Sequence, residues 1–208
     1  RLQGDWSSDV CSSDLYAEGE SSHAEGLSYA YADYSHAEGY GAAYGLGSHV
    51  EGYDTYTLGS WSHAEGFNTS ASGDYSHAEG YSTIASGQAS HTEGQYTTAS
   101  ANYSHAEGEH TSASGPHSHT EGTLTLATGQ STHAEGYNTL ASGSASHTEG
   151  YYTQAIGKGS HAEGEGTYTY SDNSHAEGIN TQTGLDRNTS QYVDAAGSHT
   201  EGINTSTA

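Results

Sequence analysis

The sequence predicts an all-β protein, a parallel β-roll or β-solenoid of 14-residue coils with two short strands in each coil. The first observation behind this prediction is the motif Ser/Thr-His-x-Glu-Gly, which occurs thirteen times. Its histidines are His23, His36, His49, His63, His77, His91, His105, His119, His133, His147, His161, His175 and His199. They are 13 residues apart twice, then 14 residues apart nine times, and finally 24 residues apart. A fixed period of this kind indicates stacked structural repeats.

The second observation is that each repeat divides into two similar sevens. Residues 132–138 read THAEGYN and residues 139–145 read TLASGSA, so both follow the pattern Ser/Thr-x-small-x-Gly-x-x. Five alternating residues followed by two turn-forming residues predict a strand and a turn in each seven. Alternate side chains of a strand point to opposite faces, so Ser or Thr, Ala and Gly share one face while His and Glu share the other.

The third observation is the small size of the side chains on the first of these faces. Only Gly, Ala, Ser and Thr let the two strands of a coil lie back to back, so this face is predicted to be the interior. A threonine column is therefore expected inside, which argues against an ice-binding surface: Thr69, Thr83, Thr97, Thr111, Thr125, Thr139 and Thr153. Each glycine is expected to take the positive φ of a tight corner. Coils about 4.8 Å apart predict a rod on the order of 60 Å long.

The composition differs from that of an ordinary globular domain. The 208 residues include 29 Gly and 18 Tyr but one Phe, one Pro and no Met, and 26 Asp and Glu outnumber three Lys and Arg. Low hydrophobicity with a formal charge of -23 is typical of disorder, but a disordered chain has no need of a strict period. So acidic a chain is not expected to bind nucleic acid. It has no apolar run of membrane-spanning length and no signal peptide, so we expect an internal fragment without direct membrane contact.

The sequence predicts four segments. Residues 1–15 contain DWSSDVCSSDL, which resembles the in-frame translation of a common sequencing adapter, so we expect them, with the single cysteine Cys11, to be non-native. Residues 16–184 are predicted to form β-roll repeats. Residues 185–194 are predicted to be an insertion loop, and residues 195–208 a further repeat.

The repeats resemble those of a known family. The stretch SHAEGFNTSASGDYSHAEGYSTIASG, residues 62–87, is similar to the head repeat of trimeric autotransporter adhesins, and the resemblance covers roughly residues 16–208. It implies a left-handed roll of three chains, exposed on the cell surface through an outer-membrane anchor, that attaches to host proteins or glycans. Adhesin heads commonly carry apolar residues where this chain has His and Glu. The His-Ala-Glu-Gly form is also similar to phage and prophage tail-fibre repeats, which implies instead a shaft in a virion tail.

The motif histidines, each with the glutamate two residues after it, form what we call the His–Glu ladder. Because the predicted interior is thin, an outer face is expected to meet other copies of the chain in a homotrimer. The expected interface residues are His63, Glu65, His133, Glu135, His147 and Glu149. Neighbouring carboxylates are expected to raise the pKa of these histidines, which predicts greater stability near pH 6 than near pH 8.

A second interpretation of the same ladder is metal binding, since Zn²⁺ accepts imidazole and carboxylate ligands. The candidate ligands are His77, Glu79, His91, Glu93, His105, Glu107, His119 and Glu121. Apart from this alternative, no cofactor is expected. No residue stands out as a nucleophile, so the sequence does not predict an enzyme.

Aromatic residues follow the motif glycine in many coils and form a candidate ligand surface at Tyr81, Tyr137 and Tyr151. They are expected to form a stacked ladder that covers the edge of the roll, or a row of platforms for glycans. Arg187 and Tyr192 in the insertion extend the candidate surface, because inserted loops of repeat proteins often carry binding residues. The sequence thus predicts the structural or adhesive region of an extracellular fibre, with a phage shaft and a metal-binding ladder as alternatives.

Overall fold

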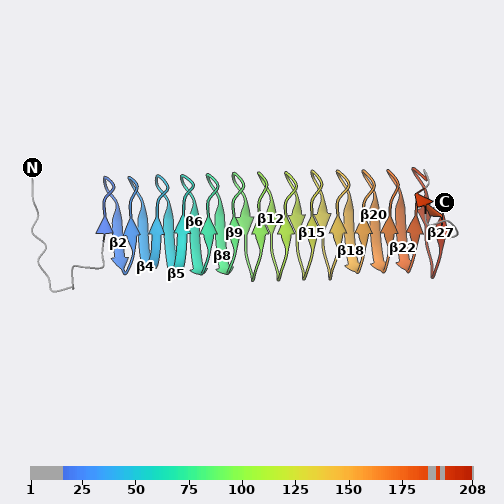
Figure 1. Ribbon diagram of the computed structural model, residues 1–208, viewed down its shortest axis with the longest axis horizontal. Coiled ribbons are helices and arrows are strands. Elements are labelled where there is room, and N and C mark those ends of the chain that lie inside the picture. The colour runs from blue at the N-terminus through green and yellow to red at the C-terminus, as the bar shows by residue number, and fades with distance from the viewer. Residues whose placement is uncertain (1–15, 187–190, 193–194, 208) are drawn as a thin grey trace, which may run out of the picture.

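The coils stack along one axis into a straight rod, as Figure 1 shows. The structure, a computed structural model, describes residues 16–186, 191–192 and 195–207. The proposed non-native segment 1–15, with Cys11, and Arg187 of the insertion lie outside these residues. Twenty-five of the described strands belong to one sheet, and its strand pairs are parallel. This confirms the predicted parallel β-solenoid with two short strands in each 14-residue coil.

The first strand of each coil begins at the motif histidine. These strands are β2 (His23–Gly26), β4 (His36–Ala43), β5 (His49–Thr57), β6 (His63–Phe67), β8 (His77–Tyr81), β10 (His91–Thr92), β12 (His105–Ala106), β14 (His119–Thr120), β16 (His133–Ala134), β18 (His147–Tyr151), β20 (His161–Glu165), β22 (His175–Ile179) and β26 (His199–Thr200). Strands β4 and β5 continue through the corner and supply the second strands of their own coils.

The second strand of each remaining coil is two residues long. These strands are β1 (Tyr16–Ala17), β3 (Tyr29–Ala30), β7 (Ser70–Ala71), β9 (Ile84–Ala85), β11 (Thr98–Ala99), β13 (Ser112–Ala113), β15 (Leu126–Ala127), β17 (Leu140–Ala141), β19 (Gln154–Ala155), β21 (Tyr168–Thr169), β23 (Gln182–Thr183) and β27 (Ser206–Thr207). Within the insertion, β24 (Leu185–Asp186) pairs antiparallel with β25 (Gln191–Tyr192), while β22 pairs directly with β26.

The register places equivalent residues of successive coils on top of one another. Between β6 and β8, for example, His63 pairs with His77 and Glu65 with Glu79. Among the described strand pairs, the register shifts once, between Tyr40 and Gly41 of β4, where a 13-residue coil meets a 14-residue coil. Every outward-facing residue type therefore becomes a column that runs along the rod.

The interior consists of small side chains from both strands of each coil. The central alanines are fully buried, and alanines of both strand columns share one core cluster, which includes Ala64 and Ala71. Val50 is the only residue larger than threonine among the most deeply buried side chains that the structure describes. The threonine column is buried as predicted, since Thr69, for example, is 0% exposed. Burial of so little apolar surface in each coil contributes little to stability.

The corners differ from the prediction that every repeat glycine takes a positive φ. The motif glycines do, with φ of 110° at Gly66, but Gly73 in the second seven does not. The left-handed residue of that seven lies two positions later, at Tyr75, with φ of 60°. At Gly73 the packing is close, because a Cβ would lie 2.0 Å from the carbonyl oxygen of Gly87 in the next coil, although Ala101 and Ser171 occupy the equivalent position in other coils.

The strands also begin one residue later than the alternation predicts, at His rather than at Ser or Thr. The backbone N–H of Ser76 donates to the carbonyl oxygen of Gly73 at 3.2 Å, so it closes the preceding turn and does not join the sheet. The Ser76 hydroxyl donates to the same carbonyl at 2.6 Å. This side-chain bond repeats in other coils and fixes the corner that presents each histidine.

Candidate functional site

The histidines of the His–Glu ladder form a continuous stack of imidazole rings. From His49 to His175, neighbouring ring centroids lie 4.6–4.9 Å apart and the ring planes are within 9° of parallel. This spacing follows from the strand separation, because each ring is carried by the first residue of a first strand. The side chains are about one-third exposed along most of the rod.

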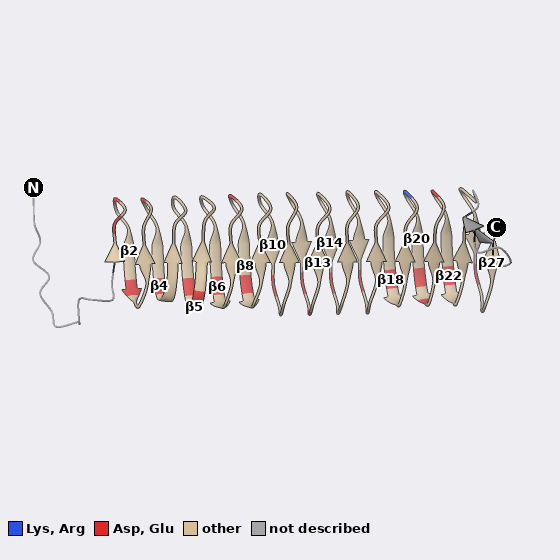
Figure 2. Ribbon diagram, in the orientation of Figure 1, with Lys and Arg blue, Asp and Glu red and all other residues tan. Residues whose placement is uncertain are grey.

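The glutamates form a second column beside the rings, two residues after each histidine, and Figure 2 shows acidic residues recurring from coil to coil. The Nε2 atom of His63 lies 3.6 Å from a carboxylate oxygen of Glu65 in its own coil. The Nε2 atom of His119 lies 3.3 Å from Glu107 in the preceding coil. Lys158 is the only lysine or arginine among the described residues. The titratable groups that lie nearest these carboxylates are therefore the ladder histidines and the glutamates of adjacent coils.

Neighbouring glutamates share protons along the column. The pKa of Glu107 is raised to about 7, chiefly by its side-chain hydrogen bond with Glu93 and then by burial. The pKa of Glu93 is lowered, chiefly because its carboxylate accepts that hydrogen bond. The same alternation continues along the column, with the pKa raised to about 7 at Glu135 and Glu163 and lowered at Glu121, Glu149 and Glu177.

The expectation that the glutamates raise the pKa of the histidines is wrong for the rings that show a shift. Burial is the largest cause and lowers the pKa of His105, and the charges of His91 and His119 lower it further. The nearby carboxylates oppose this shift but do not reverse it. The pKa is also lowered, with burial again first, at His63, His77, His133, His147 and His161. A stack of identical rings disfavours adjacent positive charges.

The structure brings both sets of sequence-predicted ladder residues onto one face. The candidate metal ligands His77, Glu79, His91, Glu93, His105, Glu107, His119 and Glu121 are half-buried neighbours, and so are the candidate interface residues His63, Glu65, His133, Glu135, His147 and Glu149. Ten ladder histidines have a buried Nε2 atom with no hydrogen-bond partner among the described residues. The face is thus rich in ligand atoms that the chain itself leaves unsatisfied.

The aromatic residues at the corners stack in two groups. Tyr40, Tyr53, Phe67 and Tyr81 follow one another with ring centroids 5.0–5.3 Å apart. Tyr137 and Tyr151 stack at 5.1 Å, and Gln95, Glu109 and Thr123 occupy the column between the two groups. Tyr81, Tyr137 and Tyr151 are 38–46% exposed, so each presents both a stacked and an open surface. Tyr192 lies in β25, apart from both groups.

An aromatic groove near the first coils was not predicted from the sequence. It has a volume of about 400 Å³ and is lined by Leu27, Tyr29, Tyr31, Tyr40, Gly41, Ala42, Tyr44, Asp54, Thr55 and Tyr56. The rings of Tyr31 and Tyr44 stack at 4.8 Å on one side of it. The 13-residue spacing of these two tyrosines, which differs from the main period, is the signal that could have revealed it.

Comparison with known proteins adds no family or relative to this description. No protein-family model matches the chain, and no curated protein is found to be similar in sequence. Of the residues described, none belongs to a helix long and apolar enough to cross a membrane. The function therefore has to be inferred from the geometry of the rod and its faces.

Proposed function

We propose that the chain is the structural or adhesive repeat region of an extracellular fibre made of three identical chains in a left-handed roll. The observation that carries this proposal is the uniform rod, whose coils present the same faces again and again above a thin interior of Ala, Ser and Thr. A face that recurs at every coil offers attachment or assembly along its whole length. This regularity favours a structural role over catalysis, which requires one distinct site.

The assembly of identical chains is favoured because the thin interior of one chain contributes little to stability. Stacked repeats are stabilised by neighbouring coils and by whatever covers their exposed faces. The His–Glu face is one-third exposed and has the most regular spacing on the rod, so identical chains pair along it without loss of register. Closed homo-oligomers place such identical faces around one symmetry axis.

Sedimentation equilibrium tests the assembly. We expect a trimer that persists on dilution and loses its β-sheet circular dichroism when the chains are forced apart. A folded monomer at low concentration would contradict the proposal.

Spin labels test which face lies inside the trimer. With Cys11 replaced by serine, a label is attached to a single cysteine at Glu107, in the ladder, or at Leu126, on the outer face of β15. Interchain distances are expected to be shorter from position 107. Longer distances from 107 than from 126 would place the second strands at the axis instead.

Attachment is tested with the trimer on immobilised host matrix proteins and glycans. A fibre head is expected to bind at least one of these surfaces in a saturable manner. A trimer that binds none of them would favour the phage or prophage tail-fibre shaft, which has the same rod but serves only to separate functional ends.

A further inference from the structure

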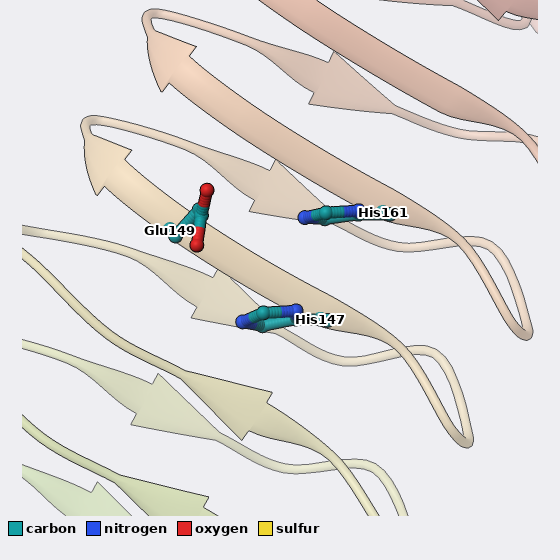
Figure 3. A group of neighbouring side chains, drawn as sticks. All are labelled: His147, Glu149 and His161. Carbon is teal, nitrogen blue, oxygen red and sulfur yellow. The ribbon is translucent and has the colours of Figure 1, made fainter.

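Each step along the His–Glu ladder brings three ligand atoms together. His147 and Glu149 come from β18 and His161 from β20, and their imidazole nitrogens and carboxylate oxygen lie within 4.8 Å of one another. Figure 3 shows the two rings parallel on successive coils with the Glu149 side chain on the same face. The same grouping recurs in other coils, for example at His161, Glu163 and His175, and at His175, Glu177 and His199.

The Nε2 atoms of the two imidazoles at this step have no hydrogen-bond partner among the described residues. The Nε2 atoms of His147 and His161 are buried and accept or donate no hydrogen bond within the described part of the chain. Carboxylate oxygens of Glu135 and Glu163 lie 3.6 Å from the Nε2 atoms of His147 and His161, respectively, which is too far for a hydrogen bond. A buried polar atom without a partner destabilises the fold unless something else satisfies it. A cation at this step would satisfy both the Nε2 atoms and the neighbouring carboxylates.

We propose that the His–Glu ladder binds divalent transition-metal cations of the Zn²⁺ class, each held by two successive motif histidines and a glutamate between them. Zn²⁺ binds nitrogen and oxygen at about 2.0–2.2 Å, which puts tetrahedral ligand atoms roughly 3.4 Å apart. Because a metal lies in the plane of the imidazole that binds it, the two rings, stacked at 4.7 Å, have to tilt toward the shared ion, and the side chains, about one-third exposed, do so by rotating about their own bonds. The fourth position is left to a ligand from outside the chain.

The stacking also fixes how many ions the ladder holds. A neutral imidazole offers one lone pair, so a histidine that binds an ion with the preceding ring is not free to bind a second ion with the following ring. Thirteen motif histidines therefore hold at most six ions, one for every two coils. The binding unit is a pair of adjacent rings rather than a single histidine.

Calorimetric titration with Zn²⁺ tests this stoichiometry on the full chain, with Cys11 replaced by serine to remove its thiolate. We expect close to six ions per chain, counted per chain whatever the state of assembly. Titration with Co²⁺ is expected to give the intense visible absorption of a tetrahedral site. Ca²⁺ and Mg²⁺, which prefer oxygen ligands, are expected to compete weakly.

Two variants with the same number of substitutions distinguish paired from single binding. One replaces alternate ladder histidines with glutamine: His36, His63, His91, His119, His147 and His175. The other replaces six consecutive ones: His119, His133, His147, His161, His175 and His199. The alternating variant leaves no adjacent rings and is expected to lose all the sites, while the consecutive variant keeps seven adjacent rings and is expected to hold up to three ions.

Histidines outside the ladder provide the matched control. His110 and His117 lie in turns and stack on Tyr96 and Tyr103. Replacing both with glutamine is expected to leave the number of zinc ions unchanged. Circular dichroism establishes that each variant is folded, and the smaller double variant His105→Gln with His119→Gln, expected to hold five ions, serves if the larger ones do not fold. Equal zinc binding by the alternating and consecutive variants, or tight Ca²⁺ binding with no zinc preference, would overturn the proposal.

Discussion

The motif glycine is the residue with the least freedom to change. From Gly26 to Gly178 its φ lies between 86° and 119°, and a Cβ would sit 2.1–2.7 Å from the carbonyl oxygen of the equivalent glycine in the next coil. The replacement Gly122→Ala is therefore expected to lower the free energy of unfolding by at least about 2 kcal/mol, measured by chemical denaturation. Gly115→Ala is the control, because Ala101 and Ser171 occupy its position in other coils. Gly115→Ala should lower the free energy of unfolding less than Gly122→Ala does. An equal loss would mean that the positive φ of Gly122 is not the cause of its effect.

In the threonine column, by contrast, a substitution is expected to stabilise the chain. The Thr111 hydroxyl is buried and has no hydrogen-bond partner among the described residues, so Thr111→Val, of nearly the same shape, removes an unsatisfied group. We expect the free energy of unfolding to rise by about 1 kcal/mol. Thr132 is equally buried but donates to the carbonyl oxygen of Gly129 at 2.8 Å, so Thr132→Val is expected to destabilise the chain. If both variants respond alike, water inside the roll already satisfies the column.

At the scale of the strand columns, the pH dependence of stability follows from two opposed sets of pKa shifts, one of glutamates and one of histidines. A raised glutamate pKa, about 7 at Glu107, Glu135 and Glu163, adds stability below pH 4.5 that is lost as the pH rises to about 7. A lowered histidine pKa acts in reverse, because protonation below about pH 6.5 destabilises the folded state. Below pH 6.5, the glutamate and histidine contributions to stability oppose each other. Between pH 6.5 and about 7, only the loss of stability caused by ionisation of the glutamates remains.

Replacing the three glutamates of raised pKa with glutamine isolates their contribution to the pH dependence of stability. An amide donates the hydrogen bond of the protonated acid at every pH, so the triple variant Glu107→Gln, Glu135→Gln and Glu163→Gln is expected to melt at a higher temperature than the parent at pH 8. At pH 5 the two should be nearly equal. Glu109→Gln, at an exposed corner, is the control and is expected to change neither value. A triple variant less stable than the parent at pH 8 would contradict proton sharing along the column.

The sequence predicted the faces of these columns but not their chemistry. Alternation with period two is a local property, so the burial of Ala64 and Thr69 could be foreseen from the motif alone. The left-handed positions could not, because Tyr75 and Ala89 hold the same conformation and share no side-chain property that favours it. The pKa of His105 is lowered first by burial and then by the charges of rings 4.6–4.7 Å away in other coils, and neither cause has a signature in a 14-residue motif.

At the scale of the whole molecule, stability is expected to depend on the number of coils. Each coil contacts only its two neighbours, so deleting one complete coil, residues 105–118, should leave a folded rod with a slightly lower melting temperature. Deleting only residues 105–111 places His119 over Thr98 in the second strand column. It also sets the motif glycines Gly94 and Gly122 against Gly115 and Ala101, whose φ is not positive. This half-coil deletion is expected to destabilise the chain much more. Calorimetry of both deletions provides the measurement, and equal losses would mean that the two sevens are interchangeable.

The exact superposition of equivalent residues has a consequence for how such a gene changes. Nearly identical tandem stretches recombine unequally, and each event adds or removes whole copies. Because one copy equals one coil, the protein lengthens or shortens by a single strand spacing while every column keeps its register. The length of the rod can therefore change without a new fold, a new core or a new face.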